Sequence, residues 1–181
     1  LLKGTPGIGV SISHTTRPMR PGEVHGRNYY FVDASDFAAM EARGEFVESA
    51  LVFGNRYGTS RVALHEALDA GRDLVLEIDW QGARRIRDLF PNAVSVFIMP
   101  PSIEELQRRL ERRGEDGPEV IARRMQAARE EVSHYKEYQY LVVNDDFDRA
   151  LGDLAAIVRA ARLATTRQQA AGAAAAACED L

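Results

Sequence analysis

Short alternations of apolar and polar residues dominate the first 72 residues of the chain and predict half-buried strands. Between them, helical spacing with Asp33 or Ser35, and Thr59 or Ser60, as capping residues predicts two short helices. A turn is expected at residues 54–55. The expected elements are strands at residues 10–13, 29–32, 45–52 and 56–58 and helices at 36–42 and 61–70. This part of the chain is therefore predicted to be a compact mixed unit.

From Asp73 onward the pattern changes to continuous apolar runs at residues 74–79, 93–99 and 140–143, separated by helical segments. Such alternation is typical of a parallel sheet that is buried on both faces. Ligands of these sheets bind beyond the carboxyl ends of the strands. Asp79 and Asn144, which follow the first and third runs, are therefore candidate functional residues. Asp79 is also well placed to cap the next helix, and that interpretation stays open.

Two arginine-rich helices are expected at residues 103–112 and 118–133, around a glycine-bearing hinge at 114–117, and a last amphipathic helix from 146 to about 167. Many of the arginines lie three or four residues from acids, which favours a solvated, salt-bridged surface. Arginines on a hinged flap also suit a lid that covers phosphates. The arginines concerned are Arg108, Arg109, Arg112, Arg113, Arg123, Arg124 and Arg129.

The composition is that of an ordinary soluble globular chain, with 181 residues, 45% hydrophobic and 28% charged. A formal net charge of −4 argues against broad binding to nucleic acid. No apolar stretch approaches the length that spans a membrane, and the single cysteine, Cys178, permits no disulfide framework within the chain. We therefore expect a cytoplasmic protein with no membrane and no nucleic-acid partner. Only Lys3 and Lys136 are lysines, so arginines would hold any bound anion.

Two arginines follow the first predicted strand, at Arg17 and Arg20, beside the hydroxyl groups of Ser13, Thr15 and Thr16. A guanidinium group matches a phosphate or carboxylate with two parallel hydrogen bonds. This stretch is therefore either an anion clamp or an arginine-rich turn exposed to water.

Glu48 is an acid within an apolar strand, where alternation places it on the face of Phe46 and Ala50. A carboxylate on a buried face would need partners. An exposed position at the edge of a sheet is the alternative, because glutamate is rarely buried.

Five segments in sequence resemble those of bacterial guanylate kinases. They are SISHTTRPMRPGEVHGRNYYFV, GEFVESALVFGNRYGTS, LEIDWQGA, the arginine-rich RRLERRG with IARRM, and VVNDDFD. The resemblance covers residues 10 to about 162, nearly the whole chain. Glu77 departs from it, since many relatives have aspartate at that position.

The resemblance implies an α/β fold of three layers, the parallel-sheet fold of P-loop nucleoside monophosphate kinases. It also implies transfer of the γ-phosphoryl group of ATP to GMP, giving ADP and GDP, with Mg²⁺ as cofactor. A homo-oligomer is compatible with it. The implied organisation is one guanylate-kinase-like domain over residues 1–181. Its core is formed by residues 73–102 and 136–167. A small mixed α/β GMP-binding insertion is expected at 14–72, a helical lid at 103–135 and a disordered tail at 168–181.

The resemblance further assigns roles to individual residues. The positions that hold the GMP phosphate correspond to Ser13, Arg17, Arg20, Tyr29 and Tyr57. The positions that read guanine correspond to Glu48 and Thr59. The acid near GMP and the metal corresponds to Asp79. The lid arginines that approach the ATP phosphates correspond to Arg113 and Arg124, and a residue near the adenine to Asn144. Asp79, Arg113 and Arg124 form the implied catalytic group, and no residue is assigned directly as a metal ligand.

The chemistry of guanine agrees with these assignments. Its N1–H and N2 amine lie side by side, so one carboxylate can accept from both, while a hydroxyl group can donate to O6. Phosphoryl transfer needs neutralised charge and in-line positioning, which arginines and Mg²⁺ supply.

One element of the family is missing from the sequence, because no GxxxxGK[ST] phosphate loop occurs in it. By the resemblance this loop precedes Leu1. We therefore expect an N-terminally truncated guanylate kinase that, as written, does not transfer phosphate. A guanylate-kinase-like module that binds GMP or a protein partner without catalysis is the alternative.

Overall fold

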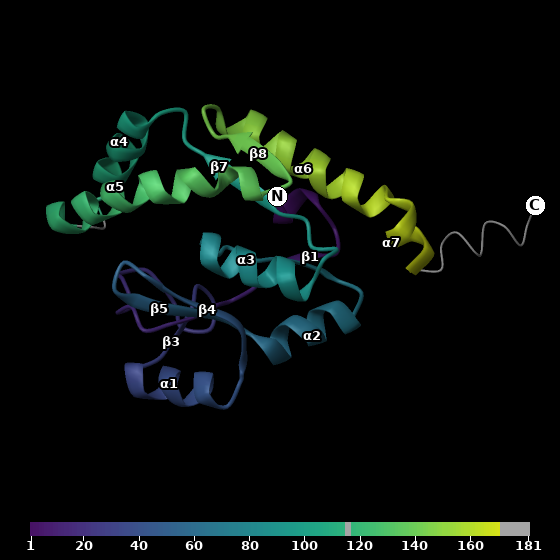
Figure 1. The fold of residues 1–181 in the computed structure, drawn as a ribbon, viewed down its shortest axis with the longest axis horizontal. Helices are drawn as coiled ribbons and strands as arrows, with labels where there is room; N and C mark the ends of the chain where they lie inside the picture. Colours follow the sequence, from purple (N-terminus) through teal and green to yellow (C-terminus); the bar gives the residue numbers. More distant parts are fainter. Residues whose placement is uncertain (115–116, 171–181) are drawn as a thin grey trace, which may run out of the picture.

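In the computed structural model, which describes residues 1–114 and 117–170, the described strands form two parallel pairs and one four-stranded sheet (Figure 1). One pair joins β1 (Ile8–Val10) to β6 (Asp73–Val75), and the other joins β7 (Val96–Met99) to β8 (Tyr140–Val143). Helices lie between the two strands of each of these pairs, so the predicted α/β class is confirmed.

The four-stranded sheet has the order β3, β2, β5, β4. Its strands are β2 (His14–Thr15), β3 (Tyr30–Phe31), β4 (Phe46–Val52) and β5 (Asn55–Ser60). The β2–β3 pair is parallel, and the other two pairs are antiparallel. With helix α1 (Ala34–Ala42), this sheet forms the lower part of the molecule in Figure 1. It corresponds to the mixed unit that the sequence predicts.

The strand predicted at residues 10–13 is wrong, because this stretch passes from one sheet to another. Val10 pairs with Val75 in β1–β6, whereas His14 pairs with Gly58 in the four-stranded sheet. Ser11 follows β1 and still donates its N–H to the Val75 carbonyl at 2.9 Å. The apolar alternation thus continues across a junction where the hydrogen-bond partners change.

Two other predicted strands are too long. Residues 74–79 supply only the end of β6, and Leu76 and Ile78 beyond it pack against the core without belonging to a strand. Residues 93–95 likewise precede β7. An apolar run records burial, and burial here extends beyond the hydrogen-bonded ladder.

The turn predicted at residues 54–55 is displaced by one residue. Val52 pairs with Asn55, so Phe53 and Gly54 are the two turn residues of the β4–β5 hairpin. Both have positive φ, 50° and 83°, as a two-residue type I′ turn requires. Phe53 is thereby held in the left-handed region at the tip of the hairpin.

Side-chain caps begin most of the described helices. Asp33 accepts from the Asp36 N–H at 2.8 Å before α1, and Ser60 caps α2 (Arg61–Asp69). Asp79, Ser102 and Asp146 cap α3 (Trp80–Leu89), α4 (Ile103–Arg113) and α6 (Phe147–Leu163). These caps are why the predicted helix starts agree closely with the structure.

The main core cluster contains the buried side chains of Val47, Leu64 and Ile86, from β4, α2 and α3. Leu74, Leu76, Ile78, Phe90 and Ala93 pack against it. Phe37 and Phe46 form a second contact between α1 and the four-stranded sheet, with ring centroids 4.6 Å apart. Helix α3 therefore packs directly against the strand that carries Glu48.

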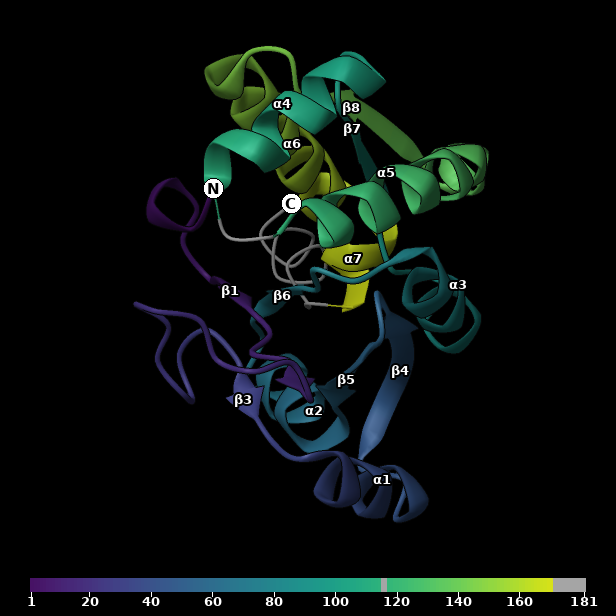
Figure 2. The same cartoon turned by 90° about the vertical axis from the view of Figure 1, so that its left-hand side faces the viewer.

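Helices α4 and α5 (Pro118–Ser133) form an antiparallel arm above the four-stranded sheet in Figure 2. Gly114 ends α4 in the left-handed region, at φ 65°. The turn η2 (His134–Glu137) then leads to β8, and η1 (Leu2–Gly4) precedes β1.

The chain ends, as far as it is described, with α6 and the short helix α7 (Thr165–Ala170). Residues 168–170 of the predicted tail therefore belong to a helix, and 171–181 lie outside the described residues. Within the described part of the chain, no helix has the length and apolar character needed to cross a membrane.

Candidate functional site

Glu48 and Thr59 face each other across β4 and β5 and are both buried, with 5% and 0% of their surface exposed. The Thr59 hydroxyl donates to Glu48 Oε1 at 2.5 Å. A β-bulge between Phe46 and Glu48 shifts the register so that three successive residues of β4 are buried. The exposed-edge alternative for Glu48 is wrong.

Burial raises the pKa of Glu48, because the charged carboxylate loses water. The hydrogen bond from Thr59 acts in the opposite direction, and the charge of Asp79 raises the pKa further. A carboxylate in this position destabilises the protein unless further donors reach it. Such a group is a typical mark of a binding site.

The first arginine of the predicted clamp, Arg17, is largely buried and already has an anionic partner. Its Nη2 lies 2.6 Å from Glu23 Oε1, and the exposed fractions of the two side chains are 10% and 17%. Its guanidinium carbon lies 5.4 Å from the ring centre of Tyr29 and 5.6 Å from that of Phe31. Arg17 is thus held by aromatic faces and a carboxylate, so the exposed-turn interpretation does not describe it.

Glu23 contacts both arginines of the clamp, a role that was not predicted from the sequence. Its Oε2 accepts from the Arg20 backbone N–H at 2.7 Å while Oε1 binds Arg17. Its spacing, six residues after Arg17 and three after Arg20 across a Pro-Gly turn, is the signal that could have identified it. Arg17 lowers the pKa of Glu23 through this hydrogen bond.

Other predicted phosphate residues lie around the clamp. The rings of Tyr29 and Tyr57 meet edge to face, with centroids 6.0 Å apart, and burial raises the pKa of Tyr29. The carbonyl of Ser13 accepts from the Tyr30 N–H at 2.9 Å. Thr15 is fully buried, and its hydroxyl accepts from the Arg17 N–H at 3.1 Å. Arg17 therefore contacts Thr15 and Glu23 of its own segment and the aromatic rings of Tyr29 and Phe31.

Asp79 serves as the cap of α3, as one interpretation predicted, and accepts from the Gly82 N–H at 2.9 Å and from Gln81 Nε2 at 3.1 Å. It also lies close enough to other acids to act on them. Its charge raises the pKa of Glu48 and of Glu131, a residue of α5 whose pKa burial raises first. Capping and a place in the site are therefore compatible.

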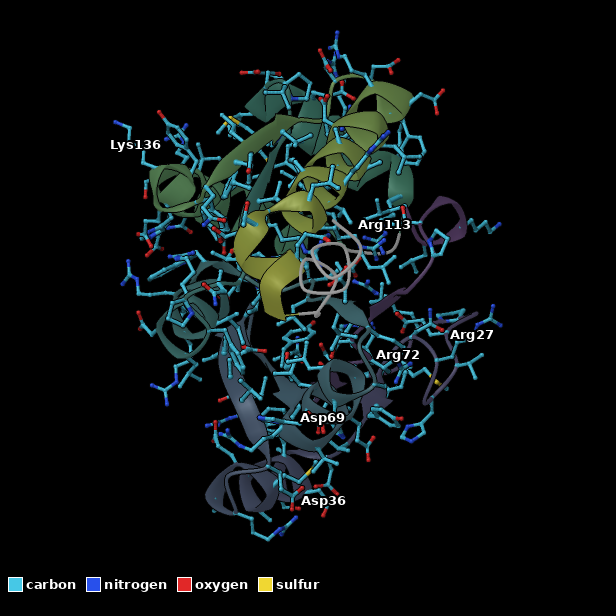
Figure 3. All side chains as sticks on the ribbon, turned by 90° about the vertical axis from the view of Figure 1, so that its right-hand side faces the viewer. Arg27, Asp36, Asp69, Arg72, Arg113 and Lys136 are labelled. Carbon is cyan, nitrogen blue, oxygen red and sulfur yellow. The ribbon has the colours of Figure 1, made fainter. Side chains whose placement is uncertain are left out.

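The predicted ATP residues lie on the two lid helices and directly after β8. Arg124 of α5 stands over Phe53, with 5.1 Å between its guanidinium carbon and the ring centre, so the lid contacts the tip of the β4–β5 hairpin. Arg113 ends α4, on the opposite side of the view from Lys136 in Figure 3. The Asn144 carbonyl accepts from Arg109 Nη1 at 2.8 Å, which joins α4 to the end of β8.

A second side-chain cluster, which was not predicted from the sequence, joins α3 to η2 at the base of the lid. Trp80 and His134 stack with centroids 3.8 Å apart, and His134 Nδ1 lies 2.6 Å from Glu137 Oε1. Arg84 and Arg87 donate to Glu137 at 2.7 and 2.8 Å. The hydrogen bonds with Arg84 and then with His134 lower the pKa of Glu137 to about 2. The lid is therefore fixed to α3 at its C-terminal end.

No group of three or more histidine, cysteine or acidic side chains suited to a metal occurs among the described residues. Mg²⁺ is usually held by one or two carboxylates together with waters and substrate phosphates. Burial raises the pKa of Glu131, and the charge of Asp79 raises it further.

An α/β core, a buried carboxylate–hydroxyl pair, a buried arginine in the same sheet unit and an arginine-bearing helical lid define the class of nucleoside monophosphate kinases. Comparison with known proteins narrows this class. Residues 1–161 match the family model described as guanylate kinase. The chain is 58% identical over 169 residues to the guanylate kinase of Alkalilimnicola ehrlichii, covering 93% of this chain and 83% of the relative. It therefore belongs to the guanylate kinase family.

Two further relatives agree with this assignment. The guanylate kinase of Escherichia coli K12 is 58% identical over 171 residues, with 93% of this chain and 83% of that protein covered. The crystal structure of guanylate kinase from Anaplasma phagocytophilum has a TM-score of 0.78 and 40% identity, covering 89% of this chain and 79% of that chain. The predicted kinase fold is thus confirmed.

Proposed function

We propose that this protein transfers the γ-phosphoryl group of ATP to GMP, giving ADP and GDP. The observation that carries the proposal is the buried pair of Glu48 and Thr59, because an acid is rarely buried without a binding role. Membership of the guanylate kinase family supports the choice of GMP over other nucleotides.

Glu48 is proposed to read the guanine base. Its two oxygens offer about four acceptor sites, and Thr59 occupies one of them, so N1–H and the N2 amine can both be accepted. The Thr59 hydroxyl has a single proton, which it gives to Glu48. Thr59 therefore orients the carboxylate in this structure, and donation to O6 would require its hydroxyl to leave Glu48.

Arg17, Arg20, Tyr29, Tyr57 and Ser13 are proposed to hold the GMP phosphate. Arg17 is positioned in advance by Glu23 and by the two aromatic rings beneath it, so little side-chain entropy is lost when an anion binds. An incoming phosphate would compete with Glu23 for this guanidinium. In this structure, the Glu23 carboxylate therefore occupies the position proposed for the phosphate.

Arg113, Arg124 and Asn144 are proposed to serve ATP from the lid and from the end of β8. When bound, Mg²⁺ neutralises charge on the phosphates, and Asp79 is the carboxylate proposed to lie nearest to it. The arginines hold the phosphoryl groups in line, and closure of α4 and α5 excludes water from them. The contact of Arg124 with Phe53 supports a lid that meets the GMP-binding insertion.

The wider predictions follow from this function. We propose residues 14–72 as the GMP-binding insertion, 103–135 as the lid, and 73–102 with 136–167 as the core. GMP and ATP are the proposed partners and the cytoplasm the proposed location. A homo-oligomer and the absence of nucleic-acid partners stay predictions from the sequence. A non-catalytic binding module is not favoured, because the relatives at 58% identity are guanylate kinases.

The test has two parts, because binding and transfer can fail separately. Calorimetric titration with GMP, IMP and AMP measures recognition, and GMP is expected to bind most tightly. GMP-dependent formation of ADP from ATP measures transfer. Equal affinity for the three nucleotides would contradict the proposed recognition, and a protein that binds GMP without transfer would support the binding-module alternative.

A further inference from the structure

Gly82 lies in the first turn of α3, three residues after the cap residue Asp79, and its backbone N–H donates to that carboxylate. It is buried, like its neighbour Ala83. The side of the helix where a side chain would stand is occupied by Glu48. A Cβ atom built on Gly82 would lie 2.6 Å from Glu48 Oε2 and 3.2 Å from Glu48 Cδ.

Such a contact is far closer than van der Waals packing permits, so either the helix or Glu48 would have to move. Glu48 has little room to move, since it is 5% exposed and its Oε1 accepts the Thr59 proton at 2.5 Å. The helix is also restrained, because the same Cβ would lie 3.3 Å from Ile78 Cβ. The absence of a side chain at Gly82 is therefore what admits the carboxylate.

We propose that Gly82 is a specificity-determining positioning residue, which allows α3 to approach Glu48 and thereby fixes the carboxylate at the depth where it reads guanine. The inference rests on the proposed role of Glu48. It goes further by assigning the depth of the base pocket to a residue that touches Glu48 without itself contacting the base.

Glycine has no other evident function at this position. Its φ lies outside the left-handed region, so no backbone conformation requires glycine there. Glycine favours the helical conformation less than alanine does. A sequence that keeps glycine here accepts that disadvantage, and the space taken by Glu48 explains why.

The experiment compares Gly82→Ala with Gly152→Ala. Gly152 lies in α6 with nothing within 4 Å of its Cβ position, so both variants gain helix propensity and only one meets Glu48. Gly82→Ala is expected to weaken GMP binding at least tenfold and to lower the ratio of GMP to IMP affinity, because IMP lacks the N2 amine. Gly152→Ala is expected to leave both unchanged.

The ratio of GMP to IMP affinity separates positioning from general destabilisation, which would weaken both nucleotides alike. An unchanged ratio in a folded Gly82→Ala protein would overturn the inference. Glu48→Gln is measured beside it. If that variant also keeps the affinity and the ratio of the unmodified protein, the proposed role of Glu48 fails. If Gly82→Ala keeps the affinity and the ratio but Glu48→Gln does not, the inference about Gly82 fails and the proposed role of Glu48 stands.

A second variant covers the case in which Gly82→Ala folds poorly. Glu48→Asp shortens the side chain by one methylene and makes room for the new Cβ. Combined with Gly82→Ala, it should restore part of the lost melting temperature, so that the two changes are less harmful together than their sum. Strictly additive losses would show that the clash does not involve Glu48 and would overturn the inference.

Discussion

The guanine end of the site and the lid use charged residues in opposite ways. Glu48 is 5% exposed, and its hydrogen bond comes from a fully buried neutral hydroxyl group, that of Thr59. On α4, Glu105 accepts from Arg108, Arg109 and Arg112, whose side chains are 67%, 33% and 72% exposed. The first arrangement is buried and uses a neutral side-chain donor, whereas the second pairs opposite charges in contact with water.

The difference agrees with the proposal that one region recognises the base and the other moves as a lid. A buried carboxylate lowers the stability of the unbound protein, and a ligand that donates to it recovers that free energy selectively. Solvated ion pairs contribute little to stability, so α4 can shift without losing much. The sequence interpretation of α4 as a salt-bridged surface is confirmed, and this property is compatible with its proposed function as a lid.

The largest expected effect is on binding of the GMP phosphate. Arg17→Ala should weaken GMP binding about 100-fold or more, because paired charged hydrogen bonds contribute about 1.5–3 kcal/mol each. Guanosine, which has no phosphate, should bind almost as before. Titrations of both ligands measure this, with the exposed Arg27→Ala as a control from the same loop (Figure 3). Equal losses for GMP and guanosine would instead indicate a folding role for Arg17.

The second prediction separates the two roles of Asp79. Asp79→Asn should keep the cap of α3, since asparagine and aspartate cap about equally well. It should reduce GMP-dependent ADP formation at least about tenfold, because the charge near the phosphates is lost. Melting temperature and steady-state kinetics together check both statements. Unimpaired transfer would leave capping as the only role of Asp79.

The third prediction concerns the stability that Glu48 costs. Burial raises its pKa, so the charged form destabilises the unbound fold above the folded pKa, and this cost disappears as the pH falls toward 4.5. Glu48→Gln should therefore raise the melting temperature at pH 7 by about 2–4 °C, the shift that about 1 kcal/mol gives in a domain of this size. The gain should shrink in acid. A lower melting temperature at pH 7 would contradict it.

The smallest effect is expected at the base of the lid. The pKa of Glu137 is lowered to about 2, so its ion pairs stabilise the fold fully above pH 4.5, and this stabilisation is lost as the pH falls toward 2. Glu137→Gln should lower the melting temperature slightly at pH 7 and leave it unchanged near pH 2. Melting curves across this range measure the difference, and a difference independent of pH would exclude the ion pairs as its cause.

The order and type of the elements could be predicted because caps and glycine ends are local signals. Asp33, Ser60 and Gly114 fix helix boundaries through bonds to their own neighbours or through their own φ. Strand limits were less predictable, since apolar residues continue at intervals after β1 and β6, where the backbone changes or loses its partners. Sheet membership depends on distant chain segments, which periodicity does not report.

In the candidate site, too, local features could be predicted from the sequence and contacts between distant segments could not. The buried state of Glu48 was left open by the sequence, because a β-bulge and the position of α3 decide it. Glu23 was not singled out, although the turn between it and Arg20 is local. The cluster of Trp80, His134 and Glu137 could not be predicted, since its members come from segments about 50 residues apart.

The central claim is that Glu48 reads guanine through two donors, and titration of Glu48→Gln with GMP and IMP tests it most directly. A glutamine keeps the shape of the side chain and the acceptor for Thr59 but loses the charge and one acceptor oxygen. We predict that GMP affinity falls by about 1.5–3 kcal/mol, as for hydrogen bonds to a charged group, and that the preference for GMP over IMP largely disappears. Unchanged affinity for GMP, with the preference intact, would contradict the account.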